Sequence, residues 1–331
     1  MKKAFQVVLG CLISAVTLYF VFKDFEFAKV EESISEMTLW PIVPFLFFVV
    51  LHYYIRCLRW RFLLPPPKER PVTMQALFDS LILGNLASCI LPLRIGEFIR
   101  PLVLTRWSEY GFGAAFISVV IERFFDLSAV LITFAIVVPM LPSTEPWVIL
   151  GAYSLGGLAG GLLLFLVLGT LFPVFVREMV ARVVRPLPER LAHLAKRFAG
   201  ELLDGAAVIK TPGRLFAIVS LTGLVWLTAY LQFWAMLYMF PYDRSFLQGV
   251  AICIFVALAV AAPSAPGFVG VFQAGVVAAC KLFSYPEAAA QVYSIVIHAT
   301  TIVFFVVLGF ALLFKHKLSL GELRKAAEKG Q

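Results

Sequence analysis

Uninterrupted apolar runs of about twenty residues recur along this chain, and each is long enough to cross a bilayer as a helix. A water-soluble fold could not hide so many of them in one core. The chain is 61% hydrophobic and 15% charged, whereas soluble domains hold about 45–50% apolar and about 25% charged residues. We therefore predict an all-α polytopic membrane protein that forms a single transmembrane domain over residues 1–331.

Six runs are predicted as full spans, at residues 4–22, 40–63, 113–139, 147–172, 214–239 and 290–314. Two further apolar stretches are broken by proline and glycine. One covers residues 75–107 with a break at 91–97, and the other covers 246–283 with a break at 262–270. Most of their arms are short for a crossing, so we expect two re-entrant hairpins with tips near the middle of the membrane. Pairs of short crossing helices are the alternative.

The distribution of Lys and Arg predicts the orientation, because cytoplasmic loops collect these residues. With both termini in the cytoplasm, 21 of the 28 Lys and Arg residues fall on the cytoplasmic side, and Arg56 and Arg59 are counted among them. Only 4 lie outside and 3 lie within the membrane. This bias predicts a multi-pass protein with both termini in the cytoplasm.

The order of elements is the same in two halves, residues 1–139 and 147–315. Each reads as two spans, a broken hairpin and a span, but the halves enter the membrane from opposite sides. Both breaks contain Pro-x-x-x-Gly, at residues 92–96 and 263–267. Broken helices in corresponding positions of inverted halves indicate a transport site. The alternative is a chance match, since Pro and Gly are common in membrane helices.

A basic cytoplasmic loop, residues 173–213, joins the halves. Leu191, Leu194, Phe198 and Leu202 follow helical spacing within it, which predicts an amphipathic helix on the anionic inner leaflet. An ordinary positively charged loop would have the same composition.

Six ionisable residues are predicted at bilayer depth, where charge is costly and usually functional. They are Arg94, Glu97, Arg100, Glu122, Arg123 and Asp126. No other cation is expected at that depth, so the set is electrically neutral. One interpretation is an ion network that holds the first hairpin to the next span. The other is that an arginine is available to an anionic head group, because its planar fork of donors suits phosphate.

Both interpretations assign roles to particular residues. Glu122, Arg123 and Asp126 are predicted to form the structural network, and His298 is a possible proton relay or an ordinary hydrogen-bonded histidine. The candidate substrate-binding residues lie at the two breaks, with Arg94 at the first tip as the foremost. They are Arg94, Arg100, Glu97, Asn85, Ser264, Gly267 and Gln273.

These motifs resemble the lysylphosphatidylglycerol synthase transmembrane region family, also described as flippase-like. The resemblance rests on Asn85, Pro-x-Arg-x-Gly-Glu at residues 92–97, Glu-Arg-x-x-Asp at 122–126 and Pro-x-x-Pro-Gly at 263–267. It implies a bacterial or archaeal inner-membrane protein that handles phospholipids or polyprenyl-linked lipids. Full synthases also carry a soluble aminoacyl-transferase domain, which we do not find after the membrane region, so lysine transfer is not expected. Many relatives have an acid where this chain has Gln273.

The leading functional hypothesis is a lipid flippase that moves an anionic phospholipid or a polyprenyl-phosphate-linked lipid by alternating access. Two alternatives stand beside it: a non-catalytic membrane partner of a lipid-modifying transferase, and an intramembrane enzyme acting on lipid head groups. The sequence contains no catalytic motif or phosphate-binding loop that we recognise. Scattered cysteines do not form a zinc pattern, so we expect no catalytic residues, no metal and no cofactor. Nucleic acid is not an expected partner.

Overall fold

The computed structural model describes residues 2–23, 25–67, 70–91, 95–142, 146–185, 196, 211–242 and 244–322, and within them all regular structure is helical. The helices are α1 (Lys2–Phe22), α2 (Phe27–Glu36), α3 (Ile42–Leu63), α4 (Met74–Ile90), α5 (Gly96–Leu104), α6 (Phe112–Val137), α7 (Pro146–Leu171), α8 (Pro173–Val183), α10 (Pro212–Leu237), α11 (Phe246–Ala259), α12 (Val271–Leu282) and α13 (Glu287–Lys315). The described residues also include two short 3-10 turns, η1 (Val138–Met140) and η3 (Pro266–Phe268).

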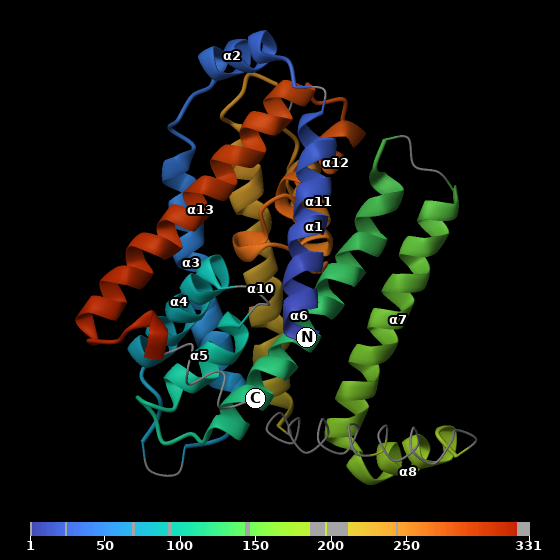
Figure 1. Ribbon diagram of the computed structural model, residues 1–331. Coiled ribbons are helices and arrows are strands. Elements are labelled where there is room, and N and C mark those ends of the chain that lie inside the picture. Colours follow the sequence, from blue (N-terminus) through green and yellow to red (C-terminus); the bar gives the residue numbers. More distant parts are fainter. Residues whose placement is uncertain are drawn as a thin grey trace.

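Each predicted span coincides with a helix, namely α1, α3, α6, α7, α10 and α13. By length and apolarity, α3, α10 and α13 qualify as membrane-crossing helices among the described residues. Helix α6 is equally long at 26 residues, but it carries Glu122, Arg123 and Asp126. Helix α2 bends away from α1 by 83° and lies across the top of the bundle in Figure 1. The multi-helix membrane architecture is confirmed, whereas the number of crossings stays a prediction.

The two broken stretches form helical hairpins in opposite halves of the molecule. Helices α4 and α5 occupy the lower half of the bundle, and α11 and α12 the upper half (Figure 1). Helix α4 ends at Ile90, within one residue of the predicted break. In the second hairpin, Gly267 and Gly270 have φ of 69° and 91°, a left-handed conformation that glycine adopts without strain. Both helices therefore break where the sequence predicts.

Close backbone contact holds the first hairpin together. A methyl group at Gly96 would collide with the Gly84 carbonyl oxygen and the Ser88 hydroxyl, and one at Gly84 would lie 2.9 Å from the Gly96 oxygen. Small residues let membrane helices approach in this way. Glycine at both positions thus allows α5 to return along α4.

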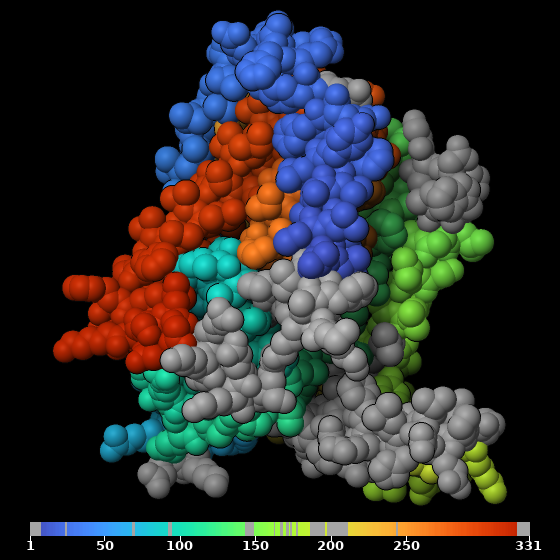
Figure 2. All heavy atoms as spheres, in the orientation of Figure 1, coloured from blue at the N-terminus to red at the C-terminus, as the bar shows by residue number. Residues whose placement is uncertain are grey.

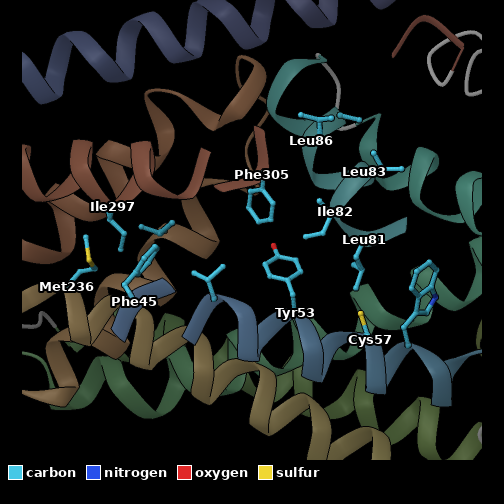
Figure 3. Packing of buried hydrophobic residues seen from close by; sticks show 14 of the residues in the cluster. Phe45, Tyr53, Cys57, Leu81, Ile82, Leu83, Leu86, Met236, Ile297 and Phe305 are labelled. Carbon is cyan, nitrogen blue, oxygen red and sulfur yellow. The ribbon is translucent and has the colours of Figure 1, made fainter. Parts of the chain in front are cut away.

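The main core joins helices from both ends of the sequence. Figure 3 shows Tyr53 of α3 pointing toward Phe305 of α13, and their ring centroids lie 5.1 Å apart at an edge-on angle. Leu81 and Leu86 of α4 belong to the same cluster. The first hairpin is therefore wedged between α3 and α13.

On the surface shown in Figure 2, parts of the two hairpins appear between α1 and α13, the orange second hairpin above the teal first one. Below them, α8 lies across the lower end of α7 (Figure 1). The amphipathic helix predicted around residues 191–202 falls outside the described residues, apart from Lys196.

Candidate functional site

A cluster of charged side chains joins α3, α5 and α6. Arg56 and Arg59 are three residues apart on α3, and Glu122 and Asp126 are four apart on α6, so each pair occupies one face of its helix. The two faces meet inside the bundle, where Arg59 and Glu122 have fully buried side chains.

Glu122 is the centre of this cluster. Its Oε1 accepts a hydrogen bond from Arg56 Nη2 at 2.7 Å, and its Oε2 accepts one from Arg100 Nη2 at 2.6 Å. Arg59 Nη2 lies 3.2 Å and Arg123 Nη2 lies 3.4 Å from Oε1. A buried carboxylate is strongly destabilising unless cations and hydrogen bonds compensate it. Glu122 therefore fixes the positions of four arginines.

Asp126 extends the network toward α10. Arg59 Nη1 donates to Asp126 Oδ1 at 2.6 Å and to the Thr222 hydroxyl at 3.1 Å. Arg123 Nη1 lies 3.8 Å from Asp126 Oδ2. Arg59 thus connects three helices, α3, α6 and α10, which supports a mainly structural role for this residue.

An aromatic platform positions Arg100. Its guanidinium lies 3.7 Å from the centroid of the Trp60 ring, well within the range of cation–π attraction. Trp60 Nε1 donates in turn to the Ser118 hydroxyl at 2.8 Å. The α5 arm of the hairpin is therefore held to α3 and α6 through one arginine.

The structure corrects two expectations about charge. Arg59 is fully buried and the Arg56 side chain is 11% exposed, so both lie between helices and not in a cytoplasmic loop, because this face of α3 packs against α6. Without them the predicted cytoplasmic count falls from 21 to 19.

The cluster is also not neutral. Its described members are four arginines, at 56, 59, 100 and 123, and three carboxylates, at 97, 122 and 126. One positive charge is therefore in excess among the described residues. The sequence-based count missed this because it treated Arg56 and Arg59 as loop residues.

A pocket of about 190 Å³ lies beside the cluster. Its polar lining consists of Arg56, Asn85, Ser88, Glu97, Arg100 and Arg123. Arg56 Nε and Arg100 Nε are buried donors without a hydrogen-bond partner, and buried polar groups are normally satisfied. Unsatisfied guanidinium donors beside a pocket with excess positive charge favour an anion there.

The second hairpin tip is braced from within. The Gln273 side-chain oxygen accepts from the Gly270 backbone N–H at 2.8 Å, and Gln273 Nε2 lies 2.9 Å from His298 Nδ1. His298 Nε2 lies 2.8 Å from the Gly267 carbonyl oxygen. This pattern fits a histidine that accepts at Nδ1 and donates at Nε2. Both ring nitrogens are thereby engaged in holding the tip.

The second hairpin tip lies against the end of α4. A methyl group at Gly267 would lie 3.4 Å from the Cys89 carbonyl oxygen at the end of α4. The next residue, Phe268, lines the pocket from the second tip and has φ of 61°, which is unusual for a bulky residue. Strained backbone of this kind clusters at functional sites.

The candidate substrate residues separate into groups. Asn85, Glu97 and Arg100 line the pocket together. Gly267 directly precedes Phe268, which also lines it. Arg94 lies outside the described residues. Gln273 is buried beside His298. Ser264 lies against α1, where a methyl group at Gly10 would be 2.9 Å from the Ser264 carbonyl oxygen.

The prediction missed Arg56, Arg59 and Trp60 as members of this region. Their signal was present, since all three fall inside the predicted span 40–63 and the arginines are one helical turn apart. Charged residues within a span usually face the bundle interior.

In the described part of the chain, no group of three or more His, Cys, Asp or Glu side chains is arranged to hold a metal ion. Comparison with known proteins adds one finding. The family model described as "Lysylphosphatidylglycerol synthase TM region" matches residues 7–309. Neither the curated proteins nor the solved structures contain a match to this chain.

Proposed function

The chain belongs to the lysylphosphatidylglycerol synthase TM region family, and we propose that it is a flippase that moves an anionic lipid across the inner membrane. The proposed substrate is a phospholipid or a polyprenyl-phosphate-linked lipid. Its phosphate would lie against Arg56 and Arg100, while its tails stay in the bilayer.

The observation that carries this proposal is the charge imbalance beside the pocket. Four arginines face three carboxylates, and two pocket-lining arginines retain unsatisfied donors. A phosphate oxygen supplies both the missing charge and the missing acceptors, and charge-assisted hydrogen bonds of this type are short and strong.

The volume of the pocket limits which part of the lipid can bind inside it. Typical small-molecule pockets measure roughly 300–1,000 Å³, whereas this one measures about 190 Å³. The space suits a phosphate and its immediate substituents. A large head group would extend beyond the pocket.

The hairpins supply the proposed movement. The two broken hairpins lie in opposite halves of the molecule (Figure 1), and residues of both line the pocket, which supports an inverted repeat of residues 1–139 and 147–315. In such repeats one half rocks against the other around a central site. The lipid phosphate would then be exposed to each leaflet in turn.

The ion pairing argues against Glu122 and Asp126 as catalytic acid–base groups. Glu122 and Asp126 are both committed to arginine partners, which leaves neither free to act on a substrate. A role as partner of a transferase rests on the basic loop 173–213, most of which lies outside the described residues.

Reconstitution tests the proposal. The purified protein is placed in liposomes with a fluorescent phosphatidylglycerol, and the fraction accessible to an impermeant quencher is followed over time. Flippase activity predicts exchange between leaflets above that of protein-free liposomes and slower exchange of an uncharged fluorescent lipid. Exchange at the protein-free rate for every lipid would refute the proposal.

A further inference from the structure

A second charged contact lies away from the arginine cluster, where the end of α13 meets α4. Asp79 of α4 is buried, and its Oδ2 lies 2.7 Å from His316 Nε2. Lys315 Nζ lies 3.5 Å from the same oxygen. The contact connects residues 237 positions apart in the chain.

The local structure holds the imidazole in place. His316 follows the last residue of α13, and its N–H donates to the Leu312 carbonyl oxygen. The chain then turns back through Lys317, with φ of 52°, and Leu318 N–H donates to the Leu313 oxygen, a typical helix-terminating motif. The His316 ring also packs on Trp107, with centroids 4.3 Å apart.

Charged groups of both signs surround the His316 ring. The buried Asp79 carboxylate faces it from α4, and the negative end of the α13 helix dipole lies at its position. Lys315 and Lys317 on its own segment oppose the extra charge. From the segment after α5, Trp107 contributes an uncharged ring, and its neighbour Arg106 interacts electrostatically with Glu322.

We propose that Asp79 and His316 form a proton-binding site that controls how firmly the first hairpin is attached to α13. The ring is partly exposed, with 21% of its side-chain area accessible, so protons can reach it. A protonated His316 makes a charge-assisted bond to Asp79, which is about twice as strong as a neutral one. When the imidazole loses its proton, this charge-assisted bond is lost and the attachment weakens.

A weaker attachment at Asp79 also affects the pocket, because α4 contributes residues to the pocket lining. Asn85 and Ser88 lie about 1.7 and 2.5 turns beyond Asp79 on the same helix, and both line the pocket. Loosening α4 at its lower end would free the arm that forms one wall of the proposed lipid site. This site, and not His298 with its two engaged nitrogens, is then the place where protons act.

Hydrogen–deuterium exchange of residues 74–90 in the full-length protein tests the proposal without requiring any lipid substrate. Parent, His316→Gln and His316→Arg proteins are compared at the same pH, between 5.5 and 8.5, so that the chemical pH dependence of exchange cancels. At pH 5.5 the parent should exchange about fivefold more slowly than His316→Gln. At pH 8.5 this difference should shrink.

The other variants fix the interpretation. His316→Arg carries a permanent charge and should keep slow exchange at both pH values, and Asp79→Asn should abolish the pH-dependent difference. Lys315→Gln is the matched control and should retain it. Identical exchange of the parent and His316→Gln at every pH, with both proteins folded by size-exclusion chromatography, would overturn the proposal. If His316→Gln does not fold, the parent is compared with His316→Arg alone. The site is supported if the parent exchanges faster than His316→Arg at pH 8.5 but not at pH 5.5. Equal exchange of the two proteins at both pH values overturns the proposal.

Discussion

The guanidinium of Arg100 lies 3.7 Å from the ring centroid of Trp60, which is fully buried. The pair connects the return arm of the first hairpin to the second long helix of the chain. Because Arg100 also binds Glu122 at 2.6 Å, the ring and the carboxylate together determine where this cation faces the pocket.

Replacing Trp60 by Leu removes both the aromatic ring that contacts Arg100 and the indole N–H that donates to the Ser118 hydroxyl. Cation–π contacts contribute about 0.5–2 kcal/mol, so we expect lipid exchange to slow by roughly twofold to thirtyfold. Trp60→Phe keeps a ring and should retain more activity than Trp60→Leu. Equal rates for the parent and both variants would show that Arg100 does not depend on Trp60.

Glu122→Gln should be the most destabilising single change in the arginine cluster. It leaves buried arginines without their shared counter-ion, and breaking a buried pair in this way costs about 3–5 kcal/mol. Thermal unfolding in detergent measures the effect. The matched control is Glu178→Gln on α8, whose side chain is 63% exposed and whose loss should leave the melting temperature nearly unchanged. A similar melting temperature for both variants would contradict the central position of Glu122.

Gly96→Ala should disrupt the first hairpin, because the added methyl group collides with Gly84 and Ser88. Overpacking typically costs about 1–3 kcal/mol. We expect lower thermal stability and slower lipid exchange. Gly157→Ala on α7 is the control, since a methyl group there meets no atom within 4 Å. Tolerance of alanine at residue 96 would argue against the close approach of α4 and α5.

The variant His298→Gln distinguishes the two roles considered for His298, bracing of the second hairpin tip and proton relay. If His298 mainly braces the second tip, its loss should lower stability by about 1–3 kcal/mol, the cost of leaving a buried partner unsatisfied. The pH dependence of the remaining lipid exchange should keep the parent's shape. A flattened pH profile with unchanged stability would instead support the relay.

The helices were predictable from sequence because the signals that define them are local. Apolar runs marked the long helices, and Pro92 and Pro263 with their following glycines marked the breaks. Each of these properties acts within a few residues, so no knowledge of neighbours in space was needed.

The site was only partly predictable because its partners come from distant segments. Arg56 lies near the end of a predicted span, so its sequence context is that of an ordinary positive-inside residue. Its place in the charged cluster depends on the packing of α6 against α3. The Gln273–His298 contact and the approach of Gly267 to Cys89 likewise depend on packing between hairpins. A helical-face analysis of span 40–63 could have identified Arg56 and Arg59, but not their acidic partners.

The most direct test of the account concerns Arg56, whose side chain lines the pocket and is 11% exposed. The measurement is the initial rate of leaflet exchange of fluorescent phosphatidylglycerol in proteoliposomes, for the parent, Arg56→Gln and the exposed control Arg182→Gln. Loss of a charged hydrogen-bond partner costs about 1.5–3 kcal/mol, so Arg56→Gln should exchange this lipid roughly ten- to a hundredfold more slowly, with the control at the parent rate. Parent-like exchange by a folded Arg56→Gln protein would contradict the assignment of this pocket to the lipid phosphate.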